Sequence, residues 1–173
     1  CSIGSLAVDT RNWSESEKLE ELQFLSKFRL VAHNIPFDGG VFARYVPFRE
    51  VNWQFCTLGL YMQLANEGFP NQKYGLKDAQ KTLLSWENTN EKELDEWLVR
   101  EGLTNKLERL KKLTTPELRL EAYNSRDKNG NRKLLPDKSQ MYRAPHEILG
   151  HYCALDSDST WLLLTRVLLP GLK

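Results

Sequence analysis

The first half of the chain alternates short apolar runs with amphipathic stretches. Arg29 to Ala32 is a short apolar run bounded by polar residues, which is typical of a buried strand. Trp53 to Cys56 is a second such run and predicts another strand. Before them, Ser14 to Glu17 reads Ser-Glu-Ser-Glu, a capping box that predicts a helix N-terminus. Strands that alternate with helices predict an α/β layer fold.

Polar breaks divide the rest of the chain into expected helices. Cys1–Ile3 and Leu6–Val8 predict a short hairpin at the start. The turn from Asp127 to Arg132 has Asn-Gly at its tip, and Lys133 to Arg143 reads as irregular. Helices are expected from Thr57 to about Glu67, from Leu76 to Leu84, from Glu91 to Arg100, from Thr104 to Leu113, from Thr115-Pro116 to about Tyr123, and from Pro145 to about Val167.

Composition adds that this is one ordinary globular domain, residues 1–173, with an uneven charge. The chain has 40% apolar and 27% charged residues, and no run approaches the roughly 20 apolar residues of a membrane span. Three cysteines without paired spacing favour free thiols in a reducing compartment. The net charge is +1, yet Arg100 to Arg143 holds 12 Lys or Arg and 6 Asp or Glu.

Two stretches of the chain carry acidic residues at positions that suit a ligand-binding or catalytic site. Asp38 follows the first strand and opens an amphipathic run that reads as a helix, and ligands in open α/β sheets collect beyond strand ends. The alternative is that Asp38 is a helix N-cap. Tyr152 and Asp156 stand four apart in the last expected helix, which places them on one helix face.

Together these stretches resemble the second and third motifs of the DEDDy 3′–5′ exonucleases. Asn34 to Asp38 matches Asn-x-x-(Phe/Tyr)-Asp, and Tyr152 to Asp156 matches Tyr-x-x-x-Asp. The resemblance covers nearly the whole chain and is strongest to the proofreading domain of phage-type family A DNA polymerases. It implies a ribonuclease H-like mixed sheet flanked by helices, a metal-dependent exonuclease acting on DNA 3′ ends, and a cytoplasmic protein.

The resemblance assigns roles to individual residues. Asp38 and Asp156 would be carboxylates of a two-metal Mg²⁺ or Mn²⁺ site, and we expect them to lie close together. Tyr152 would position the attacking water, because its usual pKa near 10 makes it a poor base. Asn34 would contact the terminal nucleotide or hold the motif loop. Phe37 would stack on a frayed 3′ end unless it packs in the core.

Residues 100–143 fall where an insertion between the motifs would lie. Their positive charge suits a DNA backbone, and Lys128, Arg132 and Lys133 near the turn are the candidate contacts. The alternative is a solvated face. The expected partners are single-stranded DNA or a frayed primer end, and a polymerase domain on the same or a longer chain.

The family's first motif, Asp-x-Glu on a central strand, is missing. Asp9-Thr10-Arg11 is the nearest look-alike and has Arg where Glu is required. We therefore expect a piece of a longer protein that lacks its first strand and is inactive alone. Two other functions stay open: an RNase D-like nuclease that processes RNA 3′ ends, and a non-catalytic structural or DNA-binding remnant of a polymerase.

Overall fold

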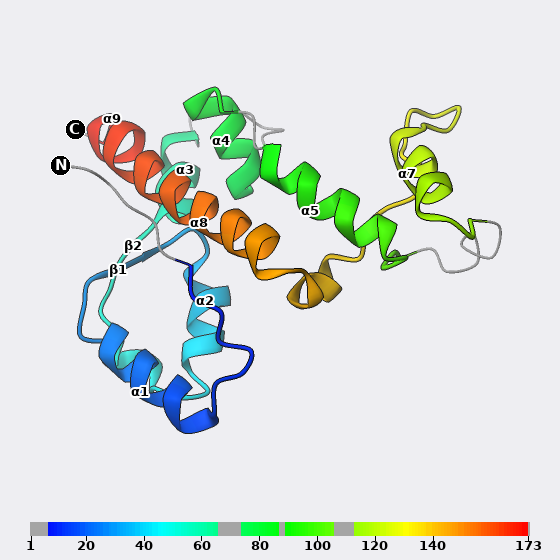
Figure 1. Cartoon of the computed structure of the whole chain (residues 1–173). Coiled ribbons are helices and arrows are strands. Elements are labelled where there is room, and N and C mark those ends of the chain that lie inside the picture. Colours follow the sequence, from blue (N-terminus) through cyan, green and yellow to red (C-terminus); the bar gives the residue numbers. More distant parts are fainter. Residues whose placement is uncertain (1–6, 66–73, 87–88, 106–112, 173) are drawn as a thin grey trace. The chain divides into compact units, whose positions relative to one another are not determined.

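The computed structural model describes residues 7–65, 74–86, 89–105 and 113–172 (Figure 1). The chain forms two compact units: Cys1–Glu87 with Ala154–Lys173, and Asn88–Cys153. The described chain is mostly helical, with a small parallel sheet of two strands flanked by helices, so the prediction of a mixed α/β protein is confirmed. Within the described ranges, no helix combines the length and apolar character needed to cross a bilayer.

The sheet of the first unit consists of the two strands that the sequence predicted. β1 spans Leu30–Ala32 and β2 spans Trp53–Cys56, and they pair in parallel with an irregularity in register after Leu30 (Figure 1). Parallel strands require a crossover connection. Helix α2, Ile35–Phe42, and a 3-10 turn, η1, Phe48–Glu50, provide it.

Helix α1, Glu15–Leu25, begins at the predicted capping box. The Ser14 hydroxyl accepts from the Glu17 amide at 3.3 Å, and the Glu17 carboxylate accepts from the Ser14 amide at 2.7 Å. These two bonds satisfy backbone donors that the first helical turn leaves without partners. The predicted hairpin falls mainly on residues outside the described part of the chain, while Ala7 and Val8 lie in no strand.

Helix α2 begins earlier than the sequence indicated. Asn34 occupies its N-cap position and Pro36 lies in its first turn, where a proline costs no hydrogen bond. Asp38 is thus an acid of the first turn, and the prediction that it opens the helix is wrong. A Cβ at Gly39 would overlap the ring of Phe48, so a larger residue there would require that half-exposed side chain to move.

The core of the first unit is helical. Helix α3, Thr57–Ala65, contributes Tyr61 and Ala65, and α4, Leu76–Leu84, contributes Ala79. Leu163 and Leu168 complete this cluster from the C-terminal segment. That segment is the end of α8, His146–Leu163, followed by a π-helical stretch, η3, Leu164–Leu168, and a short helix, α9, Leu169–Gly171.

The π-helical stretch departs from the plain helix predicted to Val167. Pro170 cannot donate to the carbonyl four residues earlier and its ring crowds that carbonyl. The preceding turn widens instead, and the Leu169 amide donates to the Leu164 carbonyl. The side chains of Leu164 and Leu168 remain buried through this change.

The second unit packs two helices with the first half of α8. Helix α5, Thr89–Arg100, ends before Gly102 at φ +75, and α7, Pro116–Asn124, is capped by the Thr115 hydroxyl. A 3-10 helix, η2, Lys138–Arg143, replaces part of the segment expected to be irregular. Two apolar clusters hold these elements together: Leu94, Leu98 and Ala144, and Val99, Tyr123 and Leu134.

The helix expected from Thr104 to Leu113 is wrong at its start. Thr104 forms an antiparallel bridge with Pro136, and the Asn105 amide donates to the Leu135 carbonyl. Residues 106–112 lie outside the described part of the chain.

Candidate functional site

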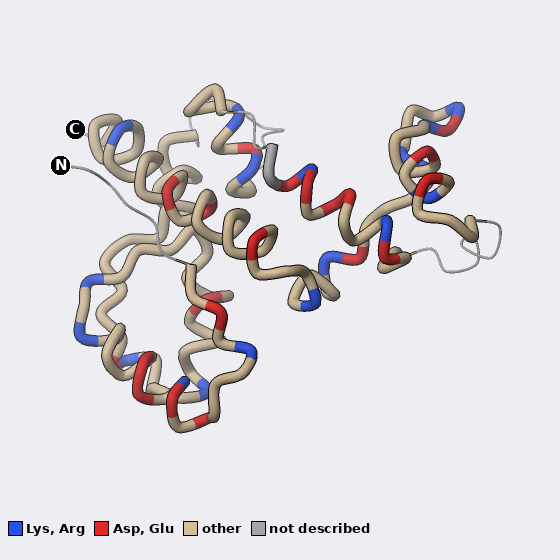
Figure 2. Tube along the Cα trace, in the orientation of Figure 1, with Lys and Arg blue, Asp and Glu red and all other residues tan. Residues whose placement is uncertain are grey.

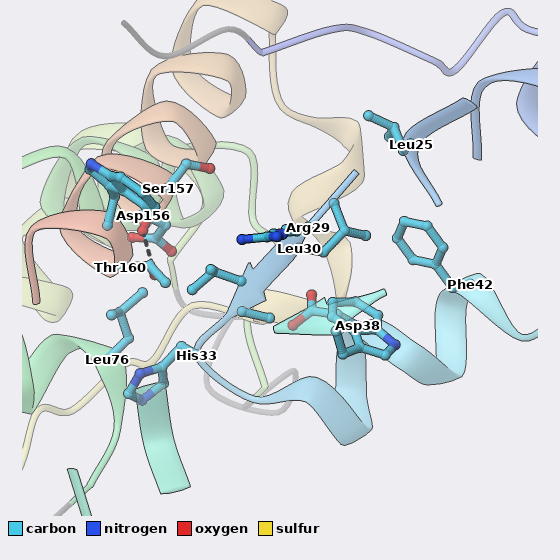
Figure 3. A pocket seen from close by; sticks show the side chains of 14 residues that line it. Leu25, Arg29, Leu30, His33, Asp38, Phe42, Leu76, Asp156, Ser157 and Thr160 are labelled. Atoms are coloured by element: carbon cyan, nitrogen blue, oxygen red, sulfur yellow. Dashed lines mark hydrogen bonds between the residues drawn. The ribbon is translucent and has the colours of Figure 1, made fainter. Parts of the chain in front are cut away.

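Asp38 and Asp156 line one pocket of about 660 Å³ in the first unit (Figure 3). Its floor includes all of β1, and one wall is the part of α8 that carries Asp156. The pocket thus runs along β1 and reaches its C-terminal end, beyond which Asp38 lies in α2. The other residues that line it are Leu25, Arg29, Leu30, Val31, Ala32, His33, Phe42, Trp53, Leu76, Ser157, Thr160 and Trp161.

Asp38 is half-buried, and its carboxylate points back toward β1 (Figure 3). Burial raises the pKa of this carboxyl above its usual value, because the ionised form loses hydration. Its own backbone amide and the nearby His33 act in the opposite direction but do not cancel this effect. The site therefore holds a carboxyl that gives up its proton less readily than one at the surface.

Asp156 faces the pocket from α8 and is neutralised by the protein itself. Its carboxylate forms an ion pair with the ammonium of Lys77 on α4, and the two side chains are 25% and 26% exposed. The backbone carbonyl of Asp156 accepts from the Thr160 hydroxyl at 2.8 Å, one turn further along the helix. Asp38 and Asp156 thus sit in different electrostatic environments.

His33 links β1 to the two segments beyond it. Its Nε2 lies 2.9 Å from the carbonyl oxygen of Tyr74, which can only accept, so this nitrogen carries the proton. Its Nδ1 lies 3.0 Å from the Thr57 hydroxyl and accepts from it. Both ring nitrogens are therefore engaged, and neither is available as a metal ligand in this arrangement.

Burial lowers the pKa of His33 below its usual value. The hydrogen bond to Tyr74 and the carboxylates of Asp156 and Asp38 oppose that effect without cancelling it. The neutral ring is the form that fits the observed pair of hydrogen bonds, because a doubly protonated ring could not accept from Thr57.

The structure adds two cations that the sequence reasoning missed. Arg29 precedes β1 directly, and its guanidinium is directed into the pocket (Figure 3). In the described part of the chain Arg29 forms no ion pair within 4.0 Å. The position of Arg29 directly before a buried strand could have identified it as a site residue from the sequence. No sequence pattern identifies Lys77, because only the packing of α4 brings it to Asp156.

Asn34 and Phe37 lie near the pocket in sequence but do not line it. Asn34 is exposed at the N-cap of α2 and makes no capping hydrogen bond with its side chain. The side chain of Phe37 is 72% exposed, so the alternative that it packs in the core is wrong. An exposed ring of this kind remains available for stacking.

Tyr152 lies on α8, one turn before Asp156, so both occupy one continuous helix as predicted. It belongs to the second unit, while Asp156 belongs to the first. The half-buried ring packs against the cluster of Leu94, Leu98 and Ala144, and the ammonium of Lys138 lies 5.7 Å from its centroid. These contacts hold the ring in place from one side.

Among the three candidate DNA contacts, Arg132 has a structural role in the second unit. Its guanidinium lies 4.3 Å from the centroid of the Tyr123 ring and 3.8 Å from a carboxylate oxygen of Asp95. The Tyr123 hydroxyl donates to Asp95 at 3.1 Å, and burial together with that carboxylate raises the pKa of Tyr123 to about 12.

Lys128 and Lys133, by contrast, are exposed. Figure 2 shows acidic and basic residues interspersed along the trace of this unit. Four acids of α5, namely Glu91, Glu93, Asp95 and Glu96, offset part of the positive charge that follows them.

The donor set at the pocket is compatible with a hydrated hard cation. Mg²⁺ is commonly bound through one or two carboxylates with several retained waters, and Asp38 and Asp156 supply two. Across the described ranges, no group of three or more His, Cys, Asp or Glu side chains is placed to hold a metal ion. Two described cations oppose a metal ion there: the Lys77 ammonium on Asp156 and the Arg29 guanidinium in the same pocket.

Searches against family models, curated proteins and solved structures found no match for this chain. The site is therefore interpreted from its own residues and from the two motifs.

Proposed function

We propose that this chain is the metal-dependent 3′–5′ exonuclease domain of a DNA polymerase and removes nucleotides from DNA 3′ ends. The observation that carries the proposal is the shared pocket of Asp38 and Asp156. These acids come from two motifs with a matching order in the sequence, and a nuclease requires them at one place. The pocket reaches the C-terminal end of β1, and ligands in open α/β sheets bind beyond strand ends.

On this proposal β1 and β2 form part of a ribonuclease H-like sheet, and α2 belongs to the crossover between them. Their parallel pairing and helical crossover are compatible with such a sheet. The family pattern includes a further strand that carries Asp-x-Glu. The chain supplies two of the four acids, so the complete site would need that pair from another segment or subunit.

Asp38 and Asp156 would hold the divalent cations, which supply Lewis acidity at the scissile phosphate when bound. Asp38 is half-buried with a raised pKa, so it binds a proton more readily than a surface carboxylate does. His33, a neutral ring engaged at both nitrogens, fixes the end of β1 just before Asn34. Tyr152 would orient the attacking water through its hydroxyl, a role that rests on the motif.

Two further residues would contact the substrate. Arg29 directs a guanidinium into the pocket, and phosphate oxygens are well matched to its fork of donors. The exposed ring of Phe37 offers a surface on which a frayed base can stack, and such stacking is tolerant of sequence. The stacking contact favours an unpaired end over an intact duplex, because only an unpaired base can reach the ring.

The test compares binding of linear and circular single strands by the full chain in Mn²⁺. We expect linear DNA with a free 3′ hydroxyl to bind at least about tenfold more tightly, because the pocket admits an end. The Asp38→Asn/Asp156→Asn double variant should lose that preference. Asp158→Asn, two positions along α8 and outside the pocket lining, is the matched control.

Each outcome separates the candidate functions. An end preference that depends on both acids supports the nuclease proposal, and a stronger preference for RNA ends would indicate the RNase D-like alternative. Equal binding of linear and circular DNA, unaffected by the double variant, would overturn the proposal in favour of a non-catalytic remnant.

A further inference from the structure

Two polar pairs with the same spacing join α4 to α8 in the first unit. Lys77 and Gln80 stand three apart on α4, and their partners Asp156 and Ser159 stand three apart on α8. The side chains of Gln80 and Ser159 are fully buried, at 1% and 0% exposure. A buried pair of this kind fixes the register of the two helices, because breaking it leaves unpaired polar groups in the core.

That register determines the partner of Asp156. With Gln80 held against Ser159, Lys77 lies one turn earlier, opposite the carboxylate that faces the pocket. A carboxylate only a quarter exposed is costly to leave without a counter-charge. The ion pair with Lys77 removes that cost without any bound ion.

We propose that Lys77 is an internal counterion that occupies the Asp156 carboxylate when no divalent cation is bound and competes with the cation for it. This inference rests on the proposed function, since it concerns the same pocket. A cation on that carboxylate and an ammonium in contact with it repel each other, so one must leave. Lysine can withdraw, because its charge is carried on a flexible four-carbon stem.

The ammonium of Lys77 can be exchanged for a divalent cation on the Asp156 carboxylate. The two side chains are 26% and 25% exposed, so a small cation can reach the carboxylate, and a divalent ion carries twice the charge of the ammonium. The competition still lowers the apparent affinity for the cation, and it lets the helices pack around a neutralised site in its absence. The protein therefore keeps α4 and α8 in register with or without the ion, through Gln80 and Ser159.

The test measures Mn²⁺ affinity of the full chain from the free-Mn²⁺ electron paramagnetic resonance signal. Lys77→Met should raise the affinity roughly three- to tenfold, because the competing charge is gone. Lys77→Arg, which keeps a cation at the position, should show no such gain. Lys81→Met is the matched control, since it removes an exposed lysine one turn along the same helix.

Adding Asp156→Asn to Lys77→Met should abolish the gain, which would place the ion at this carboxylate. Equal Mn²⁺ affinity of Lys77→Met and Lys81→Met, with binding lost in Asp156→Asn, would overturn the counterion role and leave the proposed nuclease intact. Absence of Mn²⁺ binding in every variant would overturn both. Circular dichroism of each variant confirms that helix content is unchanged, and Lys77→Gln replaces Lys77→Met if the latter does not fold.

Discussion

Asp38 and Asp156 line the same pocket although they lie at opposite ends of the sequence, one in the first turn of α2 and the other in α8. Their surroundings differ. Asp156 is paired with Lys77, whereas burial raises the pKa of Asp38. Acids with unlike environments in one pocket are typical of sites that bind cations or move protons.

Asp38→Asn should make the protein more stable at neutral pH. The folded pKa of Asp38 is raised, so its protonated form stabilises the fold below the unfolded pKa, and that stability is lost as the pH rises through the folded pKa. Asparagine cannot ionise and avoids the loss. Thermal unfolding at pH 7 should show a rise of about 1–2 °C in Tm, absent at pH 3. A lower Tm at pH 7 would mean that the ionised carboxylate makes stabilising contacts.

His33→Gln should make stability less sensitive to mild acid. The folded pKa of His33 is lowered, so the unfolded chain binds a proton more readily, and stability falls as the pH drops through the unfolded pKa near 6.5. Between pH 7 and pH 5 the parent should lose about 2–4 °C more in Tm than the variant. His151→Gln, at an exposed position of α8, should behave like the parent, and parallel curves for parent and His33→Gln would contradict the prediction.

Arg29→Met should weaken binding of single-stranded DNA without changing sequence preference. One lost phosphate contact reduces the slope of log affinity against log salt by about 0.7 for a single strand. Arg49→Met, at an exposed position in η1 outside the pocket of the two acids, should leave the slope unchanged. Fluorescence anisotropy over a salt series measures both. Equal slopes in the two variants would remove Arg29 from the substrate contacts.

In the second unit we expect Arg132 to contribute to stability, and Lys128 and Lys133 to contribute to DNA binding. Arg132→Ala should cost about 1 kcal/mol of stability, because it removes the cation from the Tyr123 ring and from Asp95. Lys128→Ala/Lys133→Ala should leave Tm unchanged and reduce the salt slope of DNA binding. Urea unfolding and anisotropy distinguish the two effects. An unchanged slope in the double variant would mean that residues 100–143 are a solvated insertion.

The chain alone should not hydrolyse DNA. The pocket offers two carboxylates where the exonuclease pattern uses four, and Lys77 occupies one of them. With Mg²⁺ or Mn²⁺ and a 3′-labelled single strand, we expect no release of mononucleotides. Metal-dependent release that Asp156→Ala abolishes would show that other residues of this chain complete the site.

The sequence determined the features that depend on near neighbours. Ser14 and Glu17 form their capping box, Thr115 and Pro116 start α7, and the two short apolar runs are the two strands. The helix starts follow from backbone donors that need caps, and the strands follow from apolar runs that need burial. Each of these signals lies within a few consecutive residues. The choice of Asp38 and Asp156 as candidate site residues also came from the sequence, through two motifs.

Only the tertiary structure decided what surrounds those acids. Lys77 reaches Asp156 across 79 positions because Gln80 and Ser159 fix the register of α4 and α8. His33 forms hydrogen bonds with the Thr57 hydroxyl and the Tyr74 carbonyl. The guanidinium of Arg132 lies over the Tyr123 ring. No local sequence pattern predicts either contact. A side chain's neighbours in space depend on how whole helices pack, and a polar residue has many equivalent partners until that packing is complete.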